Sequence, residues 1–556
     1  MAFAYRKLAL GVCLAACAAS GAIAQVFPSS TGREREQFTE PLAPRAQPGG
    51  TAISLPSTAP PPGAEKIKIV LRGVRIVGST VYSADQLTAL YQDQLGHSIS
   101  LQTVYELARR ITAKYGKDGY VLSRAIVPPQ KLDPGGAVVS IQVIEGYVDK
   151  VEWPAKLARY RDFFSSYAAK ITAERPANIR TIERYLLLAS DLPGLKFSTS
   201  LKPSATQVGA STLIAEVTEK PIEVVARFDN RTMPGRGPAE FLVSPTINNV
   251  LGQHDALTLT YAAATTPKEL QYVAGYYRQV LTSEGLTAFV DGSYSWGTPG
   301  TLDLESLRLA TNSGVGEAGL SYPVIRSREQ NLTLTGLAFL SDNFSDVLGI
   351  RFNEDRLRGF RARADADAAD SLLGINQFNL IFSQGIEGLG STENGNPLAS
   401  RAAGRVDFTK IEVTISRLQP LFSRFSAYVS AYVQYAFTPL LVPEQCGYGG
   451  RFFGRAYDPS QLLGDSCFEA IGELRYDIPV AAQFLSNVQL YGFTDYGKLY
   501  TRDPAIGTPS TVDGASAGAG IRLDWQNHFS TDLQAAKAIA GTRDDWRAFI
   551  IATARY

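Results

Sequence analysis

Long apolar runs, histidines and cysteines are scarce in this chain of 556 residues, and each scarcity excludes a class of protein. From Glu223 to Tyr556 no stretch is apolar enough to form a membrane-spanning helix. Three histidines and four cysteines cannot be arranged at familiar metal-ligand spacings. Phosphate-loop, Gly-x-Ser-x-Gly and His-Glu-x-x-His motifs are also absent. We therefore expect no metal, no nucleotide or other cofactor, and no enzymatic activity.

An excess of charge of either sign is missing as well. The 54 basic and 53 acidic residues nearly cancel, so the chain has no overall field that would attract nucleic acid or an anionic surface. We expect no nucleic-acid partner.

What the chain does have is a persistent alternation of apolar and polar residues from residue 222 to residue 556. Leu286, Ala288 and Val290 share one parity with Tyr294 and Trp296, while polar residues fill most of the other parity. Successive side chains of a strand point to opposite faces, so each segment has one apolar and one polar surface. A closed sheet of this kind is a transmembrane antiparallel β-barrel, and about ten residues per strand predicts about sixteen strands. A large soluble all-β protein is the alternative.

The N-terminus favours the membrane interpretation. Arg6 and Lys7 precede an apolar run from Leu8 to Ala19, and Ala22-Ile23-Ala24 follows, so residues 1–24 read as a secretory signal peptide. The sequence around Cys17 could instead be a lipoprotein cleavage box. Both readings take the mature chain out of the cytoplasm, which leaves the bacterial outer membrane as the expected location.

Two cysteines remain after the signal peptide, Cys446 and Cys467. They lie in one loop-like stretch, as expected for a single disulfide in an oxidising compartment. Closing that loop would stabilise it by roughly 3 kcal/mol in the chain-entropy model.

Three segments of different character precede the barrel. Residues 25–65 are rich in Pro, Gly, Ser and Thr and read as a linker, although residues 31–40 form a possible short helix. Residues 66–147 and 148–220 follow, and each shows the order strand, helix, helix, strand, strand. In the first unit Val104, Leu107, Ala108, Ile111 and Tyr115 make one apolar helical stripe.

These tandem units resemble POTRA domains, and the chain from about residue 66 onward resembles the two-partner secretion transporters, the haemolysin secretion/activation (TpsB) family. Three motifs of the first unit carry the likeness: Tyr115-Gly116-x-x-Gly119-Tyr120, Pro128-x-Gln130 and Glu145-Gly146. The second unit has Asp191-Leu192-Pro193-Gly194. The resemblance implies a sixteen-stranded barrel, two periplasmic α+β POTRA domains, and no cofactor.

Further motifs of the family lie near the cysteines. A loop-tip motif reads Gly454, Arg455, Ala456, Tyr457 and Asp458, then Gly464 and Asp465; a barrel motif reads Phe493, Asp495 and Gly497. In this superfamily a long loop folds into the barrel and its arginine meets that aspartate. The resemblance therefore implies an ion pair between Arg455 and Asp495. Ala456 replaces the usual glycine, at a cost of roughly 1 kcal/mol if the position needs a positive φ.

The implied function is transport of an unfolded exoprotein, of the adhesin or haemolysin type, through a barrel embedded in outer-membrane lipid. The helix at residues 31–40 and the Arg455 loop are the candidate plugs. A free strand edge binds an extended peptide through main-chain hydrogen bonds, and the expected edge in the first POTRA domain consists of Val121, Leu122, Ser123, Arg124, Ala125, Ile126 and Val127.

Three other functions stay open on the sequence. A barrel-assembly insertase shares the fold but usually carries more POTRA domains. A passive porin or receptor needs neither POTRA domains nor the Arg455 loop. An outer-membrane lipase needs a Ser, His and acid set, but His97, His254 and His528 have no convincing nucleophile beside them.

Overall fold

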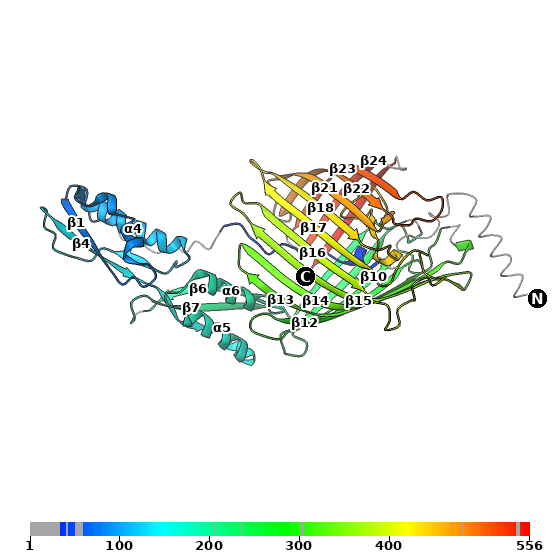
Figure 1. The fold of residues 1–556 in the computed structure, drawn as a ribbon, viewed down its shortest axis with the longest axis horizontal. Coiled ribbons are helices and arrows are strands. Elements are labelled where there is room, and N and C mark those ends of the chain that lie inside the picture. The colour runs from blue at the N-terminus through cyan, green and yellow to red at the C-terminus, as the bar shows by residue number, and fades with distance from the viewer. Residues whose placement is uncertain are drawn as a thin grey trace, which may run out of the picture.

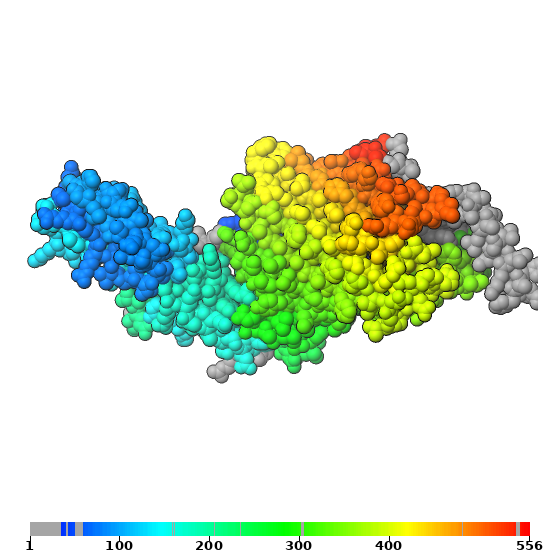
Figure 2. Space-filling model, in the orientation of Figure 1, coloured from blue at the N-terminus to red at the C-terminus, as the bar shows by residue number. Residues whose placement is uncertain are grey.

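The computed structural model describes residues 34–40, 43–49, 59–204, 206–233, 235–301, 305–480, 482–526, 528–540 and 545–556. The expected signal peptide and Cys17 lie outside these residues. Two small α/β domains extend from one end of a large barrel (Figures 1 and 2). Within the described ranges, no helix has both the length and the apolar character needed to cross a membrane.

The first small domain packs helices on a four-stranded sheet of order β2-β1-β4-β3. Its elements are β1 (Lys68–Val77), α3 (Ala84–Thr88), η2 (Gln92–Gln94), β2 (Ser98–Ser100), α4 (Leu101–Lys117), β3 (Arg124–Ile126) and β4 (Ala137–Ile144). Ser100 caps α4 by accepting a hydrogen bond from the backbone N–H of Thr103. The predicted apolar stripe of α4 is buried, and Ile111 and Tyr115 are fully enclosed.

The second small domain repeats this order of elements around a three-stranded sheet, β5-β7-β6. It consists of β5 (Tyr147–Glu152), η3 (Ala155–Tyr160), α5 (Arg161–Ala173), α6 (Ile179–Ser190), β6 (Leu195–Pro203) and β7 (Ala210–Glu219). Aromatic rings of Trp153, Phe164 and Phe197 pack within 6 Å of one another in its core.

Sixteen antiparallel strands form the closed barrel, as predicted. They are β8 (Ile222–Asp229), β9 (Glu240–Asn248), β10 (Asp255–Ala264), β11 (Gln271–Val280), β12 (Thr287–Gly297), β13 (Ala310–Arg326), β14 (Gln330–Val347), β15 (Ile350–Ala369), β16 (Ile375–Gly385), β17 (Thr409–Pro420), β18 (Phe425–Ala436), β21 (Ser466–Ile478), β22 (Asn487–Tyr500), β23 (Thr511–Trp525), β24 (Phe529–Ala540) and β25 (Trp546–Arg555). The last strand pairs with the first, so the sheet has no open edge.

The two faces of the barrel wall differ as the alternation predicts. Large apolar side chains such as Leu334, Phe360 and Leu474 stay about half exposed on the outside, where lipid would cover them. Inward residues of the same sheet include the buried Glu317, Glu473 and Asp495. The lumen is therefore polar, and two parts of the chain fill it: α2 (Glu34–Phe38) and a hairpin between β18 and β21.

Candidate functional site in the barrel lumen

The segment between β18 and β21, residues 437–465, folds back into the barrel; we call it the lumenal hairpin. It contains η4 (Val442–Glu444) and the strands β19 (Cys446–Tyr448) and β20 (Leu462–Gly464), which pair antiparallel. A disulfide joins Cys446 in the hairpin to Cys467 in the barrel wall. Tyr448 and Tyr457 are buried against apolar side chains of the wall. The hairpin is thus packed like a protein core.

Glycines at two positions permit this close fit. Gly454 has φ +67°, and a Cβ there would lie 2.7 Å from the backbone nitrogen of Gly449. A Cβ on Gly497 of β22 would lie 2.3 Å from the Tyr448 ring. Ala456 is buried and is not among the residues with positive φ. The alanine therefore fits at the tip without the backbone strain considered for it.

The predicted side-chain ion pair between Arg455 and Asp495 is wrong. The Arg455 guanidinium instead pairs with Glu473 of β21, with 2.7 Å between Nη1 and Oε2. The Asp495 carboxylate accepts from the backbone N–H of Arg455 at 3.2 Å, and from the hydroxyls of Tyr448 and Ser516 at 2.5 and 2.6 Å. Because these shorter donors occupy Asp495, the guanidinium reaches past it over the Phe493 ring to the next strand.

The sequence marks Glu473 only as part of the family-like stretch Glu473-Leu474-Arg475-Tyr476, and sequence reasoning gave its side chain no role. Its side chain is fully buried and pairs with three guanidinium groups, those of Arg455, Arg475 and Arg522, at 2.6 to 2.7 Å. Charge-assisted bonds of this kind are strong where water is excluded. The parity of β21 was a usable signal, because Glu473 shares the inward parity of Glu469 and Ile471.

Other motif residues hold the base and flanks of the hairpin. Asp465 is fully buried and accepts from Arg401 Nη1 at 2.5 Å and from the backbone N–H of Arg502 at 2.7 Å. Asp458 pairs with Arg547 of β25 at 2.8 Å. Arg231, which follows β8, donates to the carbonyl of Gly450 at 2.9 Å. The hairpin is therefore anchored on both sides of the barrel closure.

The short helix α2 also lies in the lumen (Figure 1). Arg35 pairs with Asp291 of β12 at 2.9 Å and with Glu317 of β13 at 3.1 Å. Phe38 packs on Tyr272, with 4.7 Å between ring centroids. Glu40, which follows the helix, pairs with Arg227 of β8 and with Arg451 of the hairpin, both at 2.9 Å. The helix predicted within residues 31–40 thus occupies the pore.

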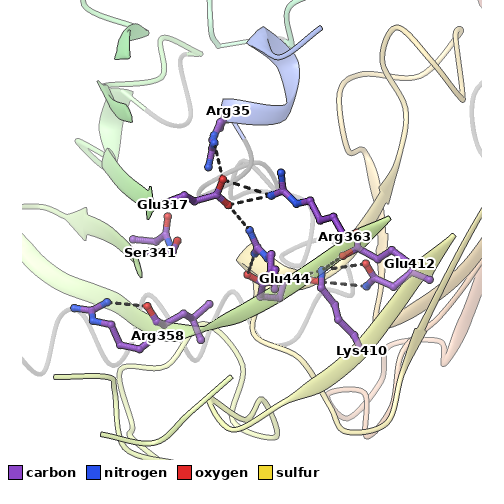
Figure 3. A network of polar contacts seen from close by, with 12 residues as sticks. Arg35, Glu317, Ser341, Arg358, Arg363, Lys410, Glu412 and Glu444 are labelled. Carbon is purple, nitrogen blue, oxygen red and sulfur yellow. Dashed lines mark hydrogen bonds and ion pairs between the residues drawn. The ribbon is translucent and has the colours of Figure 1, made fainter. Parts of the chain in front are cut away.

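A chain of ion pairs connects α2 to the base of the hairpin (Figure 3). Glu317, which holds Arg35, also accepts from Arg361 of β15 at 2.8 Å. The other Nη of Arg361 donates to Glu444 of η4 at 2.7 Å, and Lys410 of β17 pairs with the same carboxylate at 2.9 Å. α2 and the lumenal hairpin are therefore connected through the same side chains of the barrel wall, Glu317 and Arg361.

The chain leaves the lumen along the rim that faces the small domains. The backbone N–H of Ala46 donates to Asp367 of β15 at 2.5 Å, and that of Gln47 donates to the Arg328 carbonyl at 2.8 Å. Arg45 lies 3.6 Å from the carboxylate of Asp191 in the second small domain. Asp191 forms a closer bidentate pair with Arg326 of β13, at 2.7 and 2.9 Å.

The second small domain is docked on this rim by further contacts. Tyr185 and Arg184 of α6 donate to Glu284 in the β11–β12 turn, at 2.9 and 3.3 Å. Burial, followed by this bond to Glu284, raises the pKa of Tyr185 to about 12. The rings of Phe163 and His254 lie 4.1 Å apart.

In the first small domain the structure corrects the predicted open edge. β3 is an edge strand, but it spans Arg124–Ile126, so Val121, Leu122, Ser123 and Val127 lie outside it. Leu122 is buried in the core of the second domain, and Ser123 accepts from the Gly146 N–H at 3.1 Å. The Ala125 N–H already donates to Thr112. The junction between the two domains therefore takes up the first part of the predicted edge, and only Arg124–Ile126 remain as an edge strand.

Glu145 of the Glu145-Gly146 motif has a structural role. Its carboxylate accepts from the Thr80 backbone N–H and from the Tyr115 hydroxyl, both at 2.7 Å. Partial burial opposes ionisation, but these bonds and that from the Thr80 hydroxyl together lower the pKa of Glu145. No group of three or more potential metal ligands occurs among the residues that the structure describes.

Comparison with known proteins agrees with this architecture. Residues 69–146 match the POTRA domain, ShlB-type, and residues 209–523 match the family described as haemolysin secretion/activation protein ShlB/FhaC/HecB. The outer membrane transporter CdiB of Dickeya dadantii is 23% identical over 478 residues, which cover 82% of this chain and 80% of that protein. The heme/hemopexin transporter protein HuxB of Haemophilus influenzae is 22% identical over 553 residues, covering 96% and 95%.

Two solved structures share the fold. CdiB from Escherichia coli superposes with a TM-score of 0.70 at 18% identity, covering 95% of this chain and 96% of that one. CdiB from Acinetobacter baumannii gives 0.61 at 15% identity, covering 96% and 100%.

Proposed function

Because this chain belongs to the haemolysin secretion/activation protein family ShlB/FhaC/HecB, we propose that its cargo is one secreted exoprotein of the adhesin or haemolysin type, carried as an unfolded chain. The protein is an outer-membrane transporter of the two-partner secretion class, with a β-barrel in the membrane and a POTRA region in the periplasm.

One observation carries the proposal: α2 lies in the polar lumen and is held there by ion pairs and hydrogen bonds to the wall as well as by the packing of Phe38. Four of the polar contacts of α2 and Glu40 are ion pairs or charge-assisted bonds to wall residues. Arg35 and Glu40 are partly exposed, and the buried wall residues Glu317 and Arg227 keep other ion-pair partners, Arg361 and Asp229, when the helix leaves. A plug held in this way suits a pore that must open for a polypeptide and close again.

The proposed cycle needs no nucleotide. The POTRA region binds the unfolded exoprotein, α2 leaves the lumen, and the polypeptide passes through the pore in an extended form. Folding outside the cell then makes the return unfavourable, because native stability is several kcal/mol even for a small domain (roughly 5–15 kcal/mol). The polar inner wall lets the extended backbone keep hydrogen-bonding partners throughout the passage.

The test compares proteins released into the medium by the source bacterium with and without this chain. We expect one large polypeptide to be released only when the chain is present. A variant that lacks residues 34–40 should show higher resting conductance in planar bilayers. If the secreted proteins are identical in both strains while the barrel is inserted in the outer membrane, the transporter has no exoprotein cargo and the proposal is wrong.

A further inference from the structure

Resting on the proposed function, we propose that the socket of α2 in the barrel wall is itself a binding site for the exported polypeptide, and that α2 occupies it as an internal mimic of that ligand. The socket is the set of wall residues that contact residues 34–40. Its ligand is a segment of polypeptide that carries a basic side chain and an aromatic side chain close together. In the resting transporter Arg35 and Phe38 supply these two side chains.

Two carboxylates form the cation site of the socket. Asp291 of β12 and Glu317 of β13 lie directly opposite each other in the sheet, and like charges in that position repel. Arg35 pairs with both and points at Glu317 in Figure 3. When α2 leaves, Glu317 keeps its pairs with Arg361 and Arg363, at 2.8 and 3.2 Å. Asp291 has no other ion-pair partner among the described residues, so it would attract a new cation in the open pore.

An apolar pocket lies beside the cation site. Only 7% of the surface of Phe38 is exposed, and its ring centroid lies 4.7 Å from that of Tyr272. The rest of the pocket comes from β9, β10 and the residue before β11: Leu242, Ala262, Ala264 and Leu270. Departure of α2 would expose these apolar surfaces to water. An apolar side chain of a passing polypeptide is therefore favoured at this place in the lumen.

A third contact does not depend on the sequence of the ligand. The buried side chain of Arg227 on β8 donates through Nη2 to the backbone carbonyl of Gln37 at 3.3 Å. Every residue of a polypeptide carries such a carbonyl. The socket thus combines one main-chain contact with one site for a cation and one site for an aromatic ring.

The spacing of the two side-chain sites suits an extended chain as well as a helix. Arg35 and Phe38 are three residues apart on one face of α2, a rise of about 4.5 Å. In an extended chain, side chains two residues apart point to the same side and are separated by about 7 Å. The expected pattern in the exported polypeptide is therefore a basic residue, any residue, and then an aromatic residue.

One site for two ligands makes their binding mutually exclusive. While a segment of the exported polypeptide holds Asp291 and the apolar pocket, α2 cannot return to them. The pore then stays open for as long as such segments pass, and it closes when the last of them has left the lumen. The ligand that opens the pore would also be the ligand that keeps it open.

The test uses two substitutions that break the same ion pair. Arg35→Ala weakens the plug and leaves the socket intact, whereas Asp291→Asn weakens the plug and also removes the cation site. Both should raise the resting conductance in planar bilayers. Only Asp291→Asn should lower the rate at which the polypeptide is released into the medium, about fivefold to tenfold, as the loss of one charged contact predicts.

The matched control is Asp365→Asn, which removes a carboxylate of β15 that bonds to Asn379. It should leave both conductance and release unchanged. Barrel assembly of every variant is checked by heat-dependent gel mobility. Equal release by Arg35→Ala and Asp291→Asn would overturn the proposal, because Asp291 would then serve the plug alone.

Peptide block of the channel tests the socket without secretion. The full-length double variant Arg35→Ala, Phe38→Ala keeps the socket but has a weakened plug. A synthetic peptide with the sequence of residues 34–40 should lower its conductance. The same peptide with alanine in place of its arginine or its phenylalanine should need about tenfold higher concentrations.

Peptides from the released polypeptide complete the test. Those with a basic residue two positions before an aromatic residue should block the same channel, and should lose the effect when both residues are alanine. Block by the α2 peptide and by no peptide of the released polypeptide would overturn the proposal. If the wild type releases no polypeptide at all, the proposed function has failed, whereas a failed peptide block in a strain that does release it contradicts only the socket.

Discussion

The two elements that fill the lumen are held by different kinds of contact. The lumenal hairpin is covalently joined to the wall through Cys446 and Cys467, and its aromatic side chains are enclosed in an apolar cluster. α2 spans five residues, has one residue, Phe38, in an apolar cluster, and is otherwise held by polar contacts; Glu40 keeps 58% of its side chain exposed. Packing must be rebuilt when an element moves, whereas the partly exposed Arg35 and Glu40 can exchange their wall partners for water. The difference supports the proposal that α2 is the releasable plug and the hairpin a fixed part of the resting wall.

The strongest test of the hairpin anchorage is Glu473→Ala. It leaves the guanidinium groups of Arg455, Arg475 and Arg522 without their shared carboxylate, and breaking a buried pair typically costs about 3–5 kcal/mol. We expect a lower temperature for loss of the compact form in heat-modifiability gels, and noisier channels. Asp495→Asn should cost less, because the amide oxygen still accepts from the Tyr448 and Ser516 hydroxyls and only the Arg455 N–H loses its acceptor. Equal effects would contradict the assignment of Glu473 as the main anchor.

Removal of the disulfide should have the next largest effect. In the chain-entropy model, a closure of this length contributes about 3 kcal/mol. Replacing both Cys446 and Cys467 with serine should make the hairpin susceptible to external protease while α2 still plugs the pore. Mass mapping of the mature protein under non-reducing conditions should find the linked pair. Free thiols at both positions would show that the hairpin, like α2, has no covalent bond to the barrel wall.

Gly497 and Gly492 both lie in β22, and replacing each with alanine gives a matched pair of variants that tests how tightly the hairpin packs on this strand. Gly497→Ala introduces a methyl group that would lie 2.3 Å from the Tyr448 ring, and overpacking costs about 1–3 kcal/mol. Gly492→Ala places the same group on the outer face of β22, where the nearest atom, the Gly518 carbonyl oxygen, is 3.9 Å away. We expect the first variant to lose secretion and thermal stability and the second to keep both. Identical behaviour would show that the hairpin does not press on β22.

Removing the ion pairs of one α2 residue should be enough to change channel opening. Arg35→Ala removes the pairs with Asp291 and Glu317, a loss of about 1 kcal/mol or less for a partly exposed network. We expect a several-fold increase in the fraction of time that single channels spend open, with unchanged thermal stability. Arg405→Ala, which removes an exposed ion pair with Asp407 in an outer loop, is the control and should leave conductance unchanged.

The smallest expected effect is a pH dependence in the first POTRA domain, far from the lumen. The pKa of Glu145 is lowered in the folded state, so its contribution to stability is present above the ordinary glutamate pKa of about 4.3 and is lost as the pH falls through the folded value. Below about pH 4 the wild type should approach Glu145→Gln. The stability of this domain is measured by amide hydrogen exchange of residues 66–147, compared between the wild type and Glu145→Gln at each pH. A constant difference down to pH 3 would contradict it.

Periodicity alone predicted the architecture but not the contacts inside it. The alternation of strands such as β12 and β18 and the apolar stripe of α4 are local properties, and the structure confirms the sixteen strands and the buried stripe. The partner of Arg455 could not be predicted from the sequence. It depends on the hydroxyls of Tyr448 and Ser516 donating to Asp495, and only the fold brings these side chains together. The edge predicted at residues 121–127 is shorter in the structure, where Arg124–Ile126 form the edge strand and Leu122 packs in the core of the neighbouring domain.

The route of the chain from α2 past Asp367 and Asp191 to the first small domain means that the proposed plug is tethered to the transporter that it would close. A tethered ligand returns to its site at an effective concentration that a short flexible linker sets in the millimolar range (~mM). Weak individual contacts are then sufficient for complete closure at rest, since rebinding does not depend on the number of transporters in the membrane. Each pore would reseal at a rate set by the length of its own linker.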